Sequence, residues 1–150
     1  MTAGPGTLVG LHEAIKTRMA AVAATFALLP MKVNAAPQPR ADERPPAIID
    51  GWLPPKASGE ERFPFIIVRP SSGFDSEPGA DQVAGAIVKI IVGTYSDTDD
   101  GWIDALLIVD AVRQSLEAEP VLAGTGFEHV GPLLWELPEE QPRPQWHAFL

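Results

Sequence analysis

The stretch that decides the fold runs from Ala84 to Leu116 and reads AGAIVKIIVGTYSDTDDGWIDALLIVDAVRQSL. Its first part predicts a strand over Ala86–Tyr95, because β-branched residues dominate and every even position from 86 to 92 is apolar. The odd positions mix isoleucine with Lys89. One wholly apolar face and one mostly apolar face are typical of an inner strand that a helix covers on one side.

The second part of this stretch predicts a helix over Asp100–Leu116. Its large apolar residues recur at steps of three and four, as on the buried side of a helix. We expect the acidic residues Asp97 to Asp100 to supply capping oxygens and negative charge at the helix N-terminus, and Pro120 to end the unit. The predicted buried positions are Trp102, Leu106, Val109, Val112 and Leu116.

The same spacing near the N-terminus predicts another helix, Thr7–Leu29, which stops at Pro30. This segment also has the outline of a signal peptide, because Lys16 and Arg18 precede an apolar run. The helix is the preferred interpretation, since Glu13 lies in what would be the basic leader and the apolar run is too short to span a bilayer. Its predicted apolar positions are Leu8, Leu11, Ile15, Met19, Val22, Phe26 and Leu29.

The rest of the chain alternates short apolar segments with proline-rich connectors. Strands are expected at Ala47–Trp52, Phe63–Pro70 and Gln145–Leu150, and Phe127–Leu137 is expected to form one interrupted strand or two short ones. Connecting segments are expected at Ala35–Pro46, Pro54–Glu60, Ser71–Asp81, Ala123–Gly126 and Pro138–Pro144. This order predicts a single α+β domain over residues 1–150: a mainly antiparallel (mixed) β-sheet centred on the 86–95 strand, with two α-helices packed on one face and proline-rich connecting arms.

Composition narrows the classes of function. The chain has 150 residues, enough for one core, and a formal net charge of −9. That charge argues against a nucleic-acid binder that works by neutralising phosphates. The sequence has no cysteine, which excludes a disulfide framework and a thiolate metal site and fits a reducing cytosol. Sixteen prolines, about twice the usual share of ~5%, indicate short elements and stiff connections.

No pattern in the sequence predicts a catalytic, cofactor or metal site. There is no serine elbow and no glycine-rich phosphate loop, and Glu139 and Glu140 lie side by side in a connector. The acidic residues before Gly101 resemble a calcium loop, but its closing position falls on Ile108, which cannot bind a metal. The three histidines lack ligand spacing and are expected to be ordinary ones: His12, His129 and His147. We therefore predict that the protein is not an enzyme.

The tryptophans suggest a role in packing or in contacts. Trp102 stands at the head of the second helix and is expected in the core. Trp135 and Trp146 flank the last proline-rich connector, on predicted strands. Such residues are usually core, but exposed on a sheet they would be typical anchors of a protein–protein interface.

From residue 90 onward the sequence resembles the tail completion or tail terminator proteins of long-tailed bacteriophages and prophages. The matching part near the C-terminus is LLWELPEEQP over residues 133–142, of which WELPEEQP at 135–142 is the most specific, followed by PQW at 144–146. IIVGTYS at 90–96, DGW at 100–102 and the helix with Arg113 also match. Phe65–Arg69 resembles the first core strand of that family, so the likeness covers roughly the last two-thirds of the chain.

The resemblance implies a structural virion protein rather than an enzyme. Such proteins form a homohexameric ring at the head-proximal end of the tail, end the polymerisation of the tail tube and join the tail to the head. The implied partners are further copies of the chain, the tail tube protein and the head–tail connector or stopper protein. DNA would pass through the ring without specific binding, and no membrane is involved. The ring would be assembled in the cytoplasm of the host bacterium.

Two alternatives stay open. One is another neck component, such as a head-completion or stopper protein, and the other is a small soluble α+β enzyme or ligand-binding domain. For a ring, the expected contacts between subunits are the segments without a helix to cover them: Ala35–Trp52, Ser71–Asp81 and Glu139–Trp146.

Overall fold

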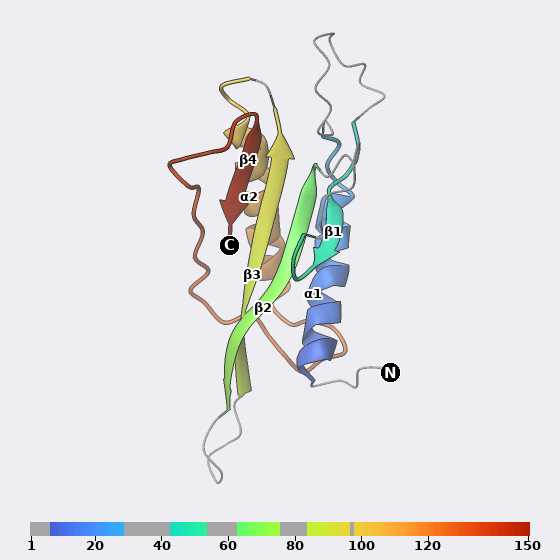
Figure 1. Cartoon of the computed structure of the whole chain (residues 1–150). Coiled ribbons are helices and arrows are strands. Elements are labelled where there is room, and N and C mark those ends of the chain that lie inside the picture. Colours follow the sequence, from blue (N-terminus) through green and yellow to red (C-terminus); the bar gives the residue numbers. More distant parts are fainter. Residues whose placement is uncertain (1–6, 29–42, 54–62, 76–83, 97) are drawn as a thin grey trace.

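The computed structural model describes residues 7–28, 43–53, 63–75, 84–96 and 98–150 (Figure 1). In chain order the elements are α1 (Leu8–Ala23), β1 (Ala47–Asp50), β2 (Phe65–Asp75), β3 (Ala84–Tyr95), α2 (Trp102–Ala118) and β4 (Gln145–Phe149). The α+β fold predicted from the sequence is confirmed. None of the helices in these described ranges is long and apolar enough to cross a membrane.

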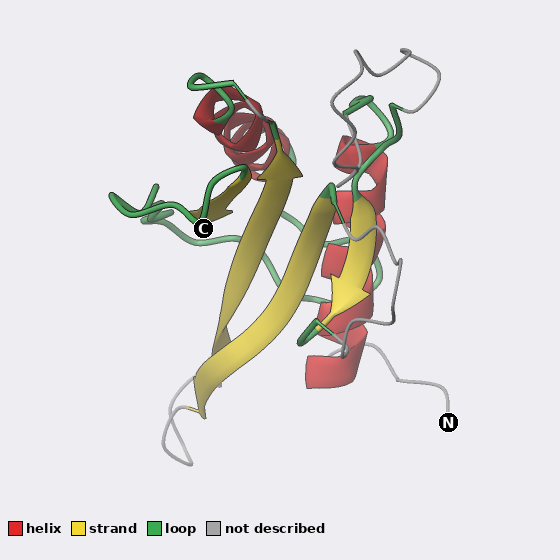
Figure 2. Ribbon diagram, turned by 45° about the horizontal axis from the view of Figure 1, so that its top comes forward, coloured by secondary structure: helices red, strands yellow, loops and turns green. Residues whose placement is uncertain are grey.

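The four strands form one sheet in the order β1-β2-β3-β4. β1 runs parallel to β2, whereas the other two pairs are antiparallel, so the sheet is mixed and mainly antiparallel as expected. β3 is an inner strand between β2 and β4. Both helices lie on the same face of the sheet, α1 behind β1 and β2 and α2 behind β3 and β4 (Figure 2).

The main core lies between the helices and this face. The even positions of β3 point toward the helices, and its residues Ile90 and Val92 are buried there together with Ile66 and Val68 of the neighbouring strand. Each helix contributes a single apolar side, as its spacing predicts. The buried helical residues are Leu11, Ile15, Met19, Val22 and Ala23 of α1, and Ala105, Ile108, Val109, Val112 and Leu116 of α2.

A second apolar cluster lies on the other face of the sheet. It consists of Phe63, Phe65, Ile67, Ile91 and Tyr95. Phe65 lies opposite Gly93 in the β2–β3 register, and a methyl group added to that glycine would come within 2.3 Å of the Phe65 ring. Because Gly93 has no side chain, the Phe65 ring can pack directly against the backbone of the neighbouring strand.

The first helix is shorter than predicted. It begins as expected, with the Thr7 side chain accepting a hydrogen bond from the Gly10 N–H (3.0 Å). It ends at Ala23 and not at Leu29, where the backbone tightens: the Thr25 and Phe26 N–H groups donate to carbonyls three residues back, those of Val22 (3.1 Å) and Ala23 (3.0 Å). Further on, Leu28 pairs with Arg44 through two backbone hydrogen bonds of 2.8 Å.

The predicted loop Ser71–Asp81 is wrong in its first half. β2 continues to Asp75, because the register shifts between Pro70 and Ser72 and the irregularity accommodates the proline within the strand. The rest of that loop, like the connector 54–60 and most of the connector 35–46, lies outside the described residues.

The segment Phe127–Leu137, expected as one interrupted strand or two short ones, forms no regular strand. The segment makes only two isolated bridges, Val121 with Glu128 and Glu136 with Phe149, and Gly131-Pro132 lies between them. A proline cannot donate to a strand ladder, so the pairing cannot become continuous. The segment still contributes partly buried Phe127, Leu133 and Leu137 to the main core.

The start of α2 differs from the prediction in two respects. Its N-cap is Gly101, and no side chain makes a capping hydrogen bond, so the acidic residues before it do not cap the helix. Trp102 is exposed and not buried. Trp146 takes the buried place beside this turn: its indole packs on Gly101 and its Nε1 donates to the Ser96 carbonyl (3.1 Å).

Candidate functional site

The three histidines lie far apart in the fold. His12 is in α1, His129 is in the loop after α2, and His147 is in β4. Burial beside Phe63 and Phe65 lowers the pKa of the His147 ring. None of the three comes near a second histidine among the described residues in a cluster that could bind metal.

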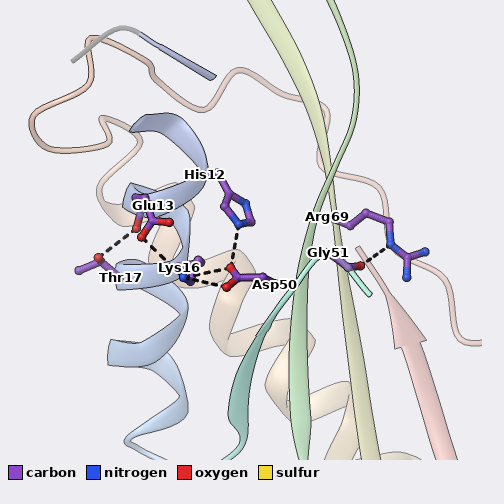
Figure 3. A network of polar contacts seen from close by, with 7 residues as sticks. All are labelled: His12, Glu13, Lys16, Thr17, Asp50, Gly51 and Arg69. Atoms are coloured by element: carbon purple, nitrogen blue, oxygen red, sulfur yellow. Dashed lines mark hydrogen bonds and ion pairs between the residues drawn. The ribbon is translucent and has the colours of Figure 1, made fainter. Parts of the chain in front are cut away.

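A polar cluster that the sequence did not predict joins α1 to β1 (Figure 3). The Asp50 carboxylate receives the Lys16 ammonium at 3.0 Å and the His12 Nε2 at 2.9 Å. Hydrogen bonding to Lys16, followed by that to His12, holds the pKa of Asp50 below its ordinary value. The i, i+4 spacing of His12 and Lys16 was the available signal, since it places both on one side of a helix.

This cluster brings three possible metal ligands together. Ligand atoms of His12, Glu13 and Asp50 lie within 4.8 Å of one another. The Lys16 ammonium already occupies the space between the acids, 3.0 Å from Asp50 and 3.6 Å from Glu13, and a metal cation would have to displace it. We therefore assign the cluster to the contact between helix and edge strand.

The acidic residues considered as ligands or catalysts do not form a site. Asp99 and Asp100 are exposed, and Asp99 pairs with Arg143 (2.8 Å), while Asp97 lies outside the described residues. Glu139 and Glu140 are both exposed. Burial, followed by the nearby charge of Asp100, raises the pKa of Asp104 in the first turn of α2.

The most distinctive surface lies on the outer side of α2. Here Ile103, Leu106, Leu107, Arg113 and Trp135 line a mainly apolar hollow of about 280 Å³, which we call the α2 hollow. Leu107 is 52% exposed and Trp135 is 53% exposed. Asp110 and Arg113, joined by an ion pair of 2.6 Å, form its polar border.

Trp135 reaches this hollow because the chain returns across α2 after the helix. Arg18 of α1 fixes the turn by donating hydrogen bonds to three carbonyls at the helix end: Ser115 (2.9 Å), Glu119 (2.9 Å) and Val121 (3.3 Å). Directly after the tryptophan, Glu136 exchanges two backbone hydrogen bonds of 2.8 Å with Phe149 of β4. Trp135 is therefore held beside α2 by backbone contacts on both sides of the returning segment.

The residues that follow, 136–142, close the outer edge of β4, and we call them the edge strap. The Gln141 side chain donates to the His147 carbonyl (2.9 Å) and accepts from the His147 N–H (2.8 Å). The Gln145 N–H donates to the Pro142 carbonyl (3.0 Å). Together with the pairing at Phe149, these contacts satisfy the outward backbone groups of the strand and protect the edge from pairing with another chain.

A comparison of the chain with models of known protein families, with curated proteins and with solved structures found no match.

The three segments expected to lie between subunits differ in how exposed they are. Trp52, at the end of the first segment, is exposed with Arg69 stacked over its ring at 5.0 Å. The second segment is partly strand, and Phe74 in it is 62% exposed. The third, Glu139–Trp146, is committed to the edge of β4, and its tryptophan is buried. Residues 35–42 of the first segment and 76–81 of the second lie outside the described residues.

Sequence reasoning missed the α2 hollow. Ile103 and Leu107 lie outside the predicted buried positions of α2, so the spacing alone gives them no role. A helix needs apolar residues on only one side to pack on the core, and further apolar residues on its other side indicate a second contact. Their presence beside the stripe was the signal for a second contact surface on the same helix.

Proposed function

We propose that the protein is a structural virion subunit that assembles through protein–protein contacts into a hexameric ring at the head-proximal end of a phage tail. In this role it ends the polymerisation of the tail tube and joins the tail to the head connector. The observation that carries the proposal is the α2 hollow, an exposed apolar surface on an otherwise well-packed helix.

The exposure of the hollow favours a protein partner. Small-molecule pockets bury most of their ligand, whereas this hollow is open beside Leu107 and Trp135, which are about half exposed. Contiguous apolar surface on a soluble protein marks a contact site. An aromatic residue at the border of such a surface, here Trp135, is typical of interface anchors.

The resemblance supports the choice of partner. Its most specific residues, 135–142, provide both Trp135 at the hollow and the edge strap along β4. A strapped edge also suits a closed ring, since copies cannot join by extending the sheet at β4 and must meet through other surfaces. The net charge of −9 fits a ring through which DNA slides without being held.

The first test is the mass of the purified protein in solution, measured by sedimentation over a wide range of concentrations. We expect a hexamer for the wild type and a monomer for Leu107→Lys, because a charge in the hollow cannot be desolvated on contact. Leu8→Lys is the matched control: Leu8, at 60% exposed, lies on α1 and should leave the hexamer intact. A wild type that stays monomeric at every concentration would contradict the proposal.

The second test distinguishes the place of the ring in the virion. Particles that lack the protein should have tails longer than normal, because nothing ends the polymerisation of the tube. Normal tails that fail to remain attached to heads would instead identify a stopper or head-completion protein.

A further inference from the structure

A second apolar hollow, of about 380 Å³, lies on the sheet face away from the helices, and we call it the sheet hollow. Its floor belongs to the second apolar cluster, and Trp52 at its border is 68% exposed. The α2 hollow lies on the helix side of the sheet, so the two surfaces are separate (Figure 2). The lining of the sheet hollow includes Phe65, Ile67, Ile91 and Phe149, with Trp52 and Arg69 beside them.

Arg69 brings a permanent positive charge into this apolar lining. Its Nε donates to the Gly51 carbonyl at 2.7 Å, and its guanidinium lies 5.0 Å from the centroid of the Trp52 ring (Figure 3). Both of these partners are neutral, so they fix the orientation of the guanidinium and leave its charge uncompensated. The carbonyl takes the Nε–H, and the N–H groups of both Nη atoms bond to no residue in the part of the chain that the structure describes.

Arg143 provides a comparison within the same molecule. It also lies over a tryptophan, with its guanidinium 5.2 Å from the centroid of the Trp146 ring, but it pairs with the Asp99 carboxylate at 2.8 Å. Arg69 has the same stacking without the carboxylate. A guanidinium that is already oriented and still has two free N–H groups side by side is suited to bind a carboxylate in a bidentate manner.

Lys89 adds a second positive charge on this face. It lies directly opposite Arg69 in the β2–β3 register, is exposed, and forms no ion pair with another described residue. Like charges directly opposite each other on neighbouring strands destabilise a sheet, and a bound anion would reduce that repulsion. The chain has 20 acidic residues and only 11 lysines and arginines, so a shortage of acids does not explain why these two cations are unpaired.

We propose that the sheet hollow binds an extended segment of a partner protein in which an acidic residue stands next to a large apolar one. The carboxylate accepts hydrogen bonds from the two Nη atoms of Arg69, and the apolar side chain packs on Ile67 and Ile91. A peptide fits better than a small free acid, because the hollow is open beside Trp52 and small-molecule sites bury most of their ligand. The proposal does not depend on the hexameric ring.

Isothermal titration calorimetry with the full-length protein tests this site. The probe is a hexapeptide with one glutamate between a leucine and a phenylalanine, acetylated and amidated so that the glutamate carries its only charge. We expect the same peptide with glutamine in place of glutamate to bind at least about tenfold more weakly, because a charge-assisted bidentate contact is lost. Arg69→Gln should bind both peptides alike.

Three further variants separate the role of Arg69 from a general effect of charge or folding. Arg143→Gln is the matched control and should keep the full preference for glutamate, because Arg143 is already paired with Asp99. Arg69→Lys keeps the charge without the paired N–H groups and should keep only part of the preference. Lys89→Gln, at an exposed position, should reduce the preference severalfold even if Arg69→Gln does not fold.

Several results would overturn the proposal. They are a wild type that binds neither peptide or binds both equally, a preference for glutamate that survives in both Arg69→Gln and Lys89→Gln, and an equal loss of preference in Arg143→Gln. Isovalerate, a free carboxylate with an apolar body, should bind far more weakly than the glutamate peptide. Equal affinity for isovalerate would assign the hollow to a small acid and overturn the peptide site. A protein that stays monomeric would contradict the ring and leave this site standing.

Discussion

Thr94 is a polar side chain enclosed by the core. It is fully buried in β3, and its hydroxyl has no hydrogen-bond partner among the described residues. A buried hydroxyl without a partner costs free energy, which an apolar side chain of the same shape avoids. We expect Thr94→Val to raise the free energy of unfolding by about 1 kcal/mol, measured by urea denaturation. Thr94→Ser, which keeps the hydroxyl and loses the methyl, should lower it.

His147 makes stability depend on pH. Burial lowers its pKa in the folded protein below the ordinary value of 6.5, so below that pH the unfolded chain takes up the proton first. The free energy of unfolding should therefore fall from pH 7 to pH 5.5, by at most about 1.4 kcal/mol per pH unit. His147→Phe keeps an aromatic ring beside Phe63 and Phe65 and should reduce this slope. An unchanged slope in the variant would contradict the role of His147.

At the scale of elements, two glycines in the β2–β3 hairpin offer a matched comparison. Gly93→Ala would press a methyl group against Phe65, which is buried and cannot move, so we expect a loss of about 1–3 kcal/mol of stability. Gly85→Ala would press against Phe74, whose exposed ring can swing aside, so stability should change by less than about 1 kcal/mol. Melting curves of the two variants measure these changes; equal losses of stability would contradict this account.

The elements were predictable where local pattern and burial agree. β3 and the apolar side of α2 followed from alternation and from helical spacing, and β4 was found despite its short length. Prediction failed where a local hydrogen bond or a distant partner decided the outcome. The backbone N–H groups of Thr25 and Phe26 turn to carbonyls three residues back where α1 ends, and Glu136 pairs with Phe149 without forming a strand. Neither event is visible in the spacing of apolar residues.

At the scale of the whole molecule, the candidate site was less predictable than the fold. Trp102 and Trp146 were assigned to similar apolar settings, yet only Trp146 is buried, because Gly101 leaves room for its indole. The α2 hollow depends on Trp135 arriving from a segment without regular structure. The hollow therefore forms only when distant segments come together in the fold. The only sign of it in the sequence is that α2 has more apolar residues than its buried side needs.

Because the edge strap covers one side of β4, the backbone hydrogen bonds on the two sides of this strand should open at different rates. At His147 the neighbouring strand is replaced by one glutamine side chain, which can rotate away from the backbone without unfolding any element. The His147 amide hydrogen should exchange with solvent long before that of Ala148, which is buried and lies opposite Val92 within the sheet. Gln141→Ala should speed exchange at His147 alone, as measured by hydrogen–deuterium exchange in NMR spectra. Amide hydrogens on the side of β4 that faces β3 should therefore exchange as slowly as those of the core. The His147 amide on the other side should exchange as fast as the Gln141 side chain can rotate away.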